Sequence, residues 1–186
     1  RTRVITAGGT PIWAPRGDRI AFTSNRGGIS DLYVRSASGP AEGDALLQTA
    51  ENKGVNDWTR DGRYIVYLAT SPSTRMDVWL LPTFGDRRPI PFLRTPFEEM
   101  QAQVSPDGRW IAYTSNESGR WEVFVQTFPM PGAKVIVSTD GGGEPQWRPD
   151  GRELFYLAAD NMLMALDVSP GPSWRAGRQR PLFRLQ

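Results

Sequence analysis

One short turn motif occurs four times along the chain at an almost constant interval. The copies span residues 13–17, 58–62, 104–108 and 147–151, and their final glycines are 45, 46 and 43 residues apart. In the third copy, Pro106 presets the backbone for the first central position of a tight turn, Asp107 can accept from a backbone N–H two residues on, and Gly108 tolerates a positive φ. The motif therefore predicts equivalent tight turns in four copies of one structural unit.

The residues around each turn predict strands and no helix. After the third turn, residues 110–114 are aromatic and β-branched, residues 115–119 form a polar loop, and residues 123–125 resume an apolar run. A repeat of about 40–45 residues with four strands per unit is typical of β-propeller blades. We therefore predict an all-β fold of four four-stranded antiparallel blades, within a larger ring of about six to eight blades.

The repeat also predicts where the blades lie and what fills the space between them. The four blades occupy approximately residues 10–49, 55–94, 101–138 and 144–185 of a single propeller segment, and residues 1–7 form the outer strand of a preceding blade. We expect the chain to be an excised piece of a longer protein. Trp13, Trp58 and Trp147, with Val104 in the equivalent position, are predicted to be buried between blades, where each large apolar side chain contributes about 1.5–3 kcal/mol.

Composition argues against several classes of site and partner. The chain has no cysteine and no histidine, which leaves no thiol or histidine for nucleophilic catalysis and no ordinary His/Cys metal site. With 22 basic and 20 acidic side chains the net charge is only +2, which does not indicate a nucleic-acid partner. No stretch approaches 18 consecutive apolar residues, so direct membrane insertion is not expected. We predict a segment without catalytic residues, metal or cofactor.

Three features together resemble the TolB-like β-propeller repeat, a WD40-like family with a Pro-Asp-Gly turn. They are the turn, the strand at 111–115 that follows it, and an acidic residue near the start of the third strand, at Asp31, Asp77 and Glu122. Two departures are Arg16 in place of the turn aspartate in blade one, and Asn161-Met162 in place of the acid in blade four. Residues 91–93 and 178–183 are similar to the extracytoplasmic propeller of bacterial membrane serine/threonine kinases. The resemblance covers nearly the whole chain.

This resemblance implies a non-catalytic propeller that binds or senses a protein or other ligand at the periplasmic or extracellular face of a bacterial membrane, as the C-terminal region of such a kinase. Two alternatives share the fold: the gating propeller of a peptidase of the prolyl oligopeptidase class, and a periplasmic scaffold of the TolB type. Fold alone does not choose among them.

Carboxylates that recur once per blade are interpreted as structural. Asp61, Asp107 and Asp150 are expected to form the turns, and Asp31, Asp77 and Glu122 to fix loops by accepting from backbone N–H groups.

The candidate site comes from the predicted architecture, because the innermost strands of a propeller line its central channel. Polar residues of these strands in blades two to four are predicted to form the wall of a binding funnel for a peptide or protein, a glycan or a cation; they are Asp57, Gln101, Gln103, Glu144 and Gln146. The alternative is a channel filled only by water. Because an open arc of blades leaves apolar faces and strand edges uncovered, we also expect self-association.

Overall fold

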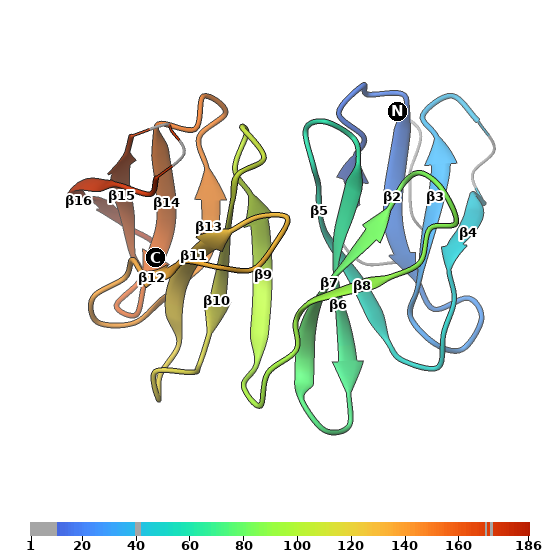
Figure 1. The fold of residues 1–186 in the computed structure, drawn as a ribbon, viewed down its shortest axis with the longest axis horizontal. Coiled ribbons are helices and arrows are strands. Elements are labelled where there is room, and N and C mark those ends of the chain that lie inside the picture. The colour runs from blue at the N-terminus through green and yellow to red at the C-terminus, as the bar shows by residue number, and fades with distance from the viewer. Residues whose placement is uncertain (1–10, 40–41, 170, 172) are drawn as a thin grey trace.

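The computed structural model describes residues 11–39, 42–169, 171 and 173–186, and these form four separate four-stranded antiparallel sheets (Figure 1). Blade one contains β1 (Ile12–Trp13), β2 (Arg19–Ser24), β3 (Asp31–Ser36) and β4 (Asp44–Leu47), and blade two contains β5 (Lys53–Trp58), β6 (Tyr64–Ser71), β7 (Arg75–Pro82) and β8 (Ile90–Leu93). Blade three contains β9 (Glu99–Val104), β10 (Trp110–Ser115), β11 (Glu122–Thr127) and β12 (Lys134–Ile136). Blade four contains β13 (Gly142–Trp147), β14 (Glu153–Ala158), β15 (Met162–Val168) and β16 (Ala176–Arg184).

These sheets confirm the predicted all-β fold of four four-stranded antiparallel units. Within each sheet the strands pair in chain order, and the described residues contain no helix. The proposed outer strand in residues 1–7 lies outside the part of the chain that the structure describes. The first strands of blades two to four, β5, β9 and β13, begin at Lys53, Glu99 and Gly142 and end at the Trp or Val of the turn motif.

All four predicted turns form in the same way. The N–H groups of Gly17, Gly62, Gly108 and Gly151 donate to the carbonyl oxygen three residues earlier at 2.7–2.9 Å, and the φ angles of these glycines lie between 70° and 76°. Asp61, Asp107 and Asp150 each accept from the backbone N–H two residues on, at 3.0, 3.2 and 3.0 Å. The interpretation of these aspartates as turn-forming is confirmed, and Arg16 does not change the turn of blade one.

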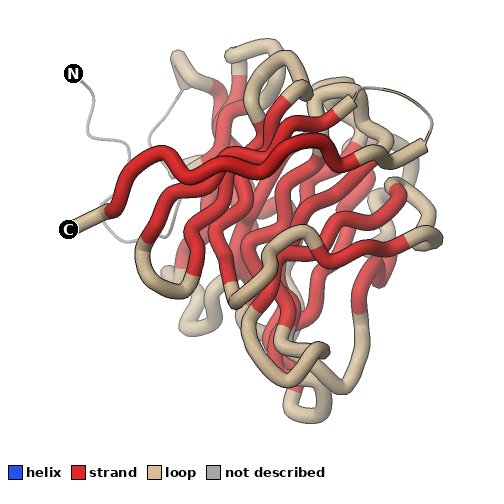
Figure 2. Tube along the Cα trace, turned by 90° about the vertical axis from the view of Figure 1, so that its left-hand side faces the viewer, coloured by secondary structure: helices blue, strands red, loops and turns tan. Residues whose placement is uncertain are grey.

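Neighbouring sheets pack face to face, and their first strands lie next to one another. Strand β1 contacts β5, β5 contacts β9, and β9 contacts β13. Figure 1 shows blades one and two on the right and blades three and four on the left. In the perpendicular view of Figure 2, strands cross the molecule, and loops and turns gather at its margins. The first strands therefore form the seam along which the blades meet.

One core cluster of buried residues fills each junction between blades. On β6, Ile65 packs into the cluster shared with blade one, whereas the next residue, Val66, packs into the cluster shared with blade three. Strand β10 does the same, because Ile111 faces blade two and Ala112 faces blade four. Successive side chains of a strand point to opposite faces, so the consecutive apolar residues of β6 and β10 serve two junctions.

The predicted burial is correct at Trp58 and Val104 but wrong at Trp13. Trp58 is only 7% exposed and packs with Ala14 of blade one, whereas Trp13 is 59% exposed. Trp147 is half-buried and donates its indole N–H to the carbonyl of Gln103 in blade three at 3.0 Å. The motif tryptophan therefore packs on the blade before its own, and Trp13 faces a side on which no described residues lie.

In blades one and three, a buried acid near the start of the third strand holds the connection to the next blade. Asp31 accepts from the backbone N–H of Thr49 at 3.4 Å and from the Lys53 ammonium at 2.7 Å. Glu122 accepts from the backbone N–H of Gly141 at 3.1 Å. The predicted loop-fixing role is thus confirmed for Asp31 and Glu122. We refer to these contacts between a third strand and the following connection as interblade clasps.

Asp77 departs from this pattern. It accepts from the Thr74 hydroxyl at 2.8 Å and lies 3.9 Å from the Arg94 guanidinium, and its other oxygen, Oδ1, has no partner among the described residues. The second clasp therefore differs chemically from the first.

The first clasp allows a direct test of how the blades are joined. Replacing Lys53 with Met leaves Asp31 buried without its cation, and we expect the free energy of unfolding to fall by about 3–5 kcal/mol, measured by urea denaturation. The double variant Asp31→Leu/Lys53→Met should recover most of the loss, because no buried charge remains. A loss below about 1 kcal/mol for Lys53→Met would show that the clasp does not join blades one and two.

Candidate functional site

The first strands of blades two to four are each interrupted by a bulge. The register shifts between Val55 and Asp57 on β5, beside Gln101 on β9, and between Gly143 and Gln146 on β13. A bulge leaves one residue unpaired and redirects the side chains around it. Gln101 and Glu144 lie within the bulges of β9 and β13, and Gln103 and Gln146 are the first paired residues after them.

The structure places the five predicted site residues in two cavities. Asp57, Gln103 and Gln146 line a groove of about 220 Å³ that also includes residues of the turns of blades two to four. Gln101 and Glu144 line a pocket of about 500 Å³ formed by the starts of β9 and β13 and by the loops that follow β10 and β14. We call these cavities the turn groove and the mouth pocket. Thr10, the polar residue at the corresponding position of blade one, lies outside the described residues.

The polar groups of the turn groove join neighbouring blades. The Asp57 carboxylate accepts from the backbone N–H groups of Trp58 and of Val104, each at 2.7 Å, and the second bond crosses from blade two to blade three. The Gln103 amide donates to the Asn56 carbonyl at 3.2 Å, again across that junction. Burial raises the pKa of Asp57 although both backbone bonds act to lower it. These contacts give Asp57 and Gln103 a structural role in the seam.

The mouth pocket is built differently, because its backbone is strained. Of the five described non-glycine residues with positive φ, three line this pocket: Gln101 at 57°, Glu144 at 54° and Asn161 at 63°. A left-handed conformation costs of order 1–3 kcal/mol at a non-glycine residue, and such residues cluster at ligand sites. The strain is held locally, since the Gln101 side-chain oxygen accepts from the Thr114 hydroxyl at 2.8 Å and from the Glu144 N–H at 2.9 Å.

Glycines form one wall of the mouth pocket, where a side chain would meet its neighbours closely. A Cβ atom on Gly142 would lie 3.0 Å from the ring of Tyr156, and one on Gly143 would lie 3.2 Å from the side-chain oxygen of Gln101. The backbone of residues 141–143 therefore borders the cavity directly. The volume falls within the range of about 300–1,000 Å³ that is usual for small-ligand sites.

The accessible chemistry of the mouth pocket is aromatic and acidic. Trp121 is 39% exposed, and the exposed carboxylate of Glu144 has no ion-pair partner among the described residues. Arg120 lies 3.6 Å from Asp140, but it also pairs at 2.5 Å with the buried carboxylate of Glu122. The charged residues that line the pocket are Arg120, Asp140 and Glu144, so its lining carries an excess of negative charge.

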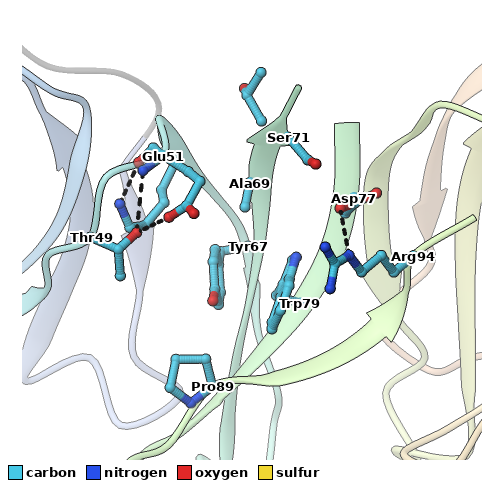
Figure 3. Close-up of a pocket in the computed structure, with 11 residues that line it drawn as sticks. Thr49, Glu51, Tyr67, Ala69, Ser71, Asp77, Trp79, Pro89 and Arg94 are labelled. Atoms are coloured by element: carbon cyan, nitrogen blue, oxygen red, sulfur yellow. Dashed lines mark hydrogen bonds and ion pairs between the residues drawn. The ribbon is translucent and has the colours of Figure 1, made fainter. Parts of the chain in front are cut away.

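A third cavity, of about 260 Å³, lies beside blade two. Figure 3 shows Tyr67 next to Trp79 on one wall, with Glu51 across from Tyr67 and Arg94 extending toward Asp77. The two rings stack with their centres 6.4 Å apart. The indole nitrogen of Trp79 has no partner in the described part of the chain, but it is closed off from solvent. This cavity has about half the volume of the mouth pocket.

Metal-binding clusters and membrane-spanning helices are both absent from the described residues. Within the described ranges, no group of three or more His, Cys, Asp or Glu side chains is arranged to hold a metal ion. The same part of the chain contains no helix long and apolar enough to cross a membrane.

Comparison with known proteins identifies the fold. No protein-family model matches this sequence, and no curated protein matches it. Among solved structures, one described as TolB from Agrobacterium tumefaciens matches with a TM-score of 0.75 and 18% identity, over 92% of this chain and 63% of that chain. TolB from Acinetobacter baumannii matches with a TM-score of 0.72 and 18% identity, over 95% of this chain and 43% of that chain.

This chain has a TolB-like propeller fold. A prolyl endopeptidase structure matches the same fold with a TM-score of 0.67 and 14% identity, over 96% of this chain and 29% of that chain. The chain thus corresponds to only part of the length of each of these proteins. At such low identities the likeness concerns the fold alone.

Sequence reasoning found two residues of the mouth pocket and missed the others. Trp121 was missed because it lies in a loop outside the repeated motif, and Asp140 because acids in connections are common. Asn161 carried a usable signal, since asparagine adopts the left-handed conformation more readily than most residues. No signal in the sequence marks Gln101 or Glu144 as left-handed.

The backbone strain at Glu144 can be measured through the free energy of unfolding. Replacing Glu144 with Gly removes a strained residue whose side chain has no ion-pair partner among the described residues, so we expect the free energy of unfolding to rise by up to about 1 kcal/mol. Glu144→Val should lower it, because a β-branched side chain tolerates positive φ poorly. Arg87→Gly, at φ 53° and away from the pocket, is the matched control and should also be stabilising. A less stable Glu144→Gly variant would mean that the backbone is not strained there.

Proposed function

We propose that this chain is a non-catalytic binding module, part of a larger propeller that works outside the cytoplasm, and that the mouth pocket is its binding site. The observation that carries the proposal is the concentration of left-handed Gln101, Glu144 and Asn161 around one cavity. The Gln101 oxygen also joins blades three and four, but the left-handed backbone itself costs free energy of folding. Strain of this kind persists where the surrounding structure positions groups for a ligand.

The pocket favours a peptide or protein ligand that presents a cationic side chain. An exposed indole attracts an ammonium or guanidinium group over its face, with a free energy of about 0.5–2 kcal/mol. The carboxylates of Glu144 and Asp140 would lie around the same charge. A glycan also stacks on tryptophan but gains less from uncompensated carboxylates, and is therefore the second ligand class to test.

The parent protein has two candidate architectures. The similarity of residues 91–93 and 178–183 to kinase propellers supports a C-terminal sensor of a membrane serine/threonine kinase. The structural match to a prolyl endopeptidase supports a gating propeller instead. Sequencing the coding DNA on both sides of this segment distinguishes them: a kinase catalytic loop and an apolar span of about 20 residues support the first, and a Gly-x-Ser-x-Gly motif with downstream Asp and His supports the second.

Binding at the mouth pocket can be tested by calorimetry with the peptide acetyl-Gly-Arg-Gly-amide and the same peptide carrying uncharged citrulline. We expect the arginine peptide to bind and the citrulline peptide to bind about tenfold more weakly or not at all. Trp121→Ala and Glu144→Gln should each weaken binding of the arginine peptide by a similar factor. Gln146→Ala, in the turn groove, is the matched control and should leave it unchanged.

Three outcomes would count against this proposal. Equal affinity for both peptides would contradict a cationic ligand, and loss of binding in Gln146→Ala alone would move the site to the turn groove. Binding of a neutral oligosaccharide that depends on Trp121, with no binding of either peptide, would keep the pocket and replace the ligand class.

We further propose that the face bearing Trp13 mediates self-association when these residues are expressed alone. The repeat shows what such a tryptophan contacts, since Trp58 packs on the blade before its own. Light scattering at increasing protein concentration should show dimers or larger species, and Trp13→Ser should reduce them. Trp121→Ser is the control with a similar loss of exposed apolar surface. A monomer at all concentrations would contradict the proposal.

A further inference from the structure

The second interblade clasp contains two acids where the first contains an ion pair. Lys53 is the first residue of β5 and lies nine residues before its turn glycine, and Glu99 is the first residue of β9 and lies nine residues before Gly108. Asp31 and Asp77 likewise occupy equivalent positions of β3 and β7. Each pairs with the residue of the second strand that lies seven positions after the turn glycine of its blade. The repeat therefore sets Asp77 opposite Glu99 as it sets Asp31 opposite Lys53.

Both acids are deeply buried, and each has one oxygen without a partner. Asp77 and Glu99 are each only 1% exposed. Glu99 accepts from the Thr95 hydroxyl through Oε1, and Asp77 accepts from the Thr74 hydroxyl through Oδ2. The remaining oxygens, Oδ1 of Asp77 and Oε2 of Glu99, are two of the three buried side-chain polar atoms without a hydrogen-bond partner in the described part of the chain.

We propose that Asp77 and Glu99 share one proton, which Glu99 Oε2 donates to Asp77 Oδ1, and that this proton joins blade two to blade three. The bond supplies a partner to both orphaned oxygens at once. Neither oxygen is accessible to a water-sized molecule. No water or metal ion therefore fits beside them, whereas a proton does. Two buried carboxylates side by side cannot both remain ionised, because repulsion and burial each favour the neutral form.

The charged groups around the pair agree with this assignment. Burial raises the pKa of Glu99 to about 7, the Thr95 hydroxyl acts to lower it, and Asp77 and Glu117 raise it further. Lys134 acts to lower it but pairs with Glu117 at 2.5 Å. On the other side, Arg94 lies 3.9 Å from Asp77, and Arg75 pairs with Glu98 at 2.9 Å. None of these cations takes the place that Lys53 holds in the first clasp.

The shared proton makes the free energy of unfolding depend on pH, in a pH range where few other side chains of this protein titrate. Between the ordinary pKa of a glutamate and about 7, the folded protein holds a proton that the unfolded chain has released, so stability falls as pH rises through this window. The chain contains no histidine or cysteine, the side chains that most often titrate there. Acidic pH therefore tightens the junction beside Met100 and Gln101 of the mouth pocket.

The test is urea unfolding of the whole chain at about pH 5 and about pH 8, for the wild type and for Glu99→Gln. We expect the unfolding midpoint of the wild type to fall between the two values, and that of Glu99→Gln, whose amide can donate to Asp77 permanently, to fall much less. Glu98→Gln makes the same charge change one residue away and should retain the wild-type fall. An equal fall in Glu99→Gln and the wild type would overturn the proposal.

A second variant and a spectroscopic readout cover the case in which Glu99→Gln fails to fold. Glu99→Lys rebuilds the Asp31–Lys53 pair in the second clasp, and should be more stable than the wild type at about pH 8 and lose the fall in midpoint. In the wild type, infrared spectroscopy should detect the C=O stretch of a protonated carboxylic acid at about pH 6 that disappears at higher pH. A Glu99→Lys variant that keeps the wild-type pH dependence, or the absence of that band, would contradict the shared proton.

Discussion

A sheet that is apolar on both faces is stable only when another sheet covers each face, and this structure depends on that constraint. Ile65 and Val66 are neighbours in sequence, yet they contribute to the cores of different junctions. The second strand of a blade therefore cannot form a complete core within its own blade. The first strands meet along the seam, and the turns, clasps and bulges serve to position one blade against the next.

The polar groups of the seam divide between stability and binding. At the turn end, Asp57 and Gln103 use their hydrogen-bonding groups to join blades two and three. At the mouth, the oxygen of Gln101 fixes the backbone of the next blade, while Glu144 remains exposed and without an ion-pair partner in the described residues. The bulge between these positions lets one strand serve both purposes.

The sequence predicted most of the fold because the repeated features are local. A glycine at positive φ and an aspartate that bonds its own turn need no distant partner, and all four turns formed as expected. The burial of Trp13 was predicted wrongly because it depends on a neighbouring blade. Trp58 and Trp13 have the same local sequence pattern, but only Trp58 has a described blade to pack on.

The site was harder to predict because it forms between units of the repeat. Gln101 and Glu144 were identified from their places on the inner strands, but the left-handed backbone and the loop carrying Trp121 depend on contacts between blades three and four. The pairing of Asp77 with Glu99 required aligning one blade with the next and then examining burial. Features that recur in every blade stabilise the propeller, and those that occur once, such as Trp121, are the better candidates for function.

The most direct measurement is a crystal structure of the chain with a bound arginine peptide. Our account predicts density for the guanidinium group over the Trp121 ring, beside the Glu144 carboxylate, with the left-handed backbone of Gln101 unchanged. Peptide density in the turn groove beside Gln146, with the mouth pocket empty, would contradict it.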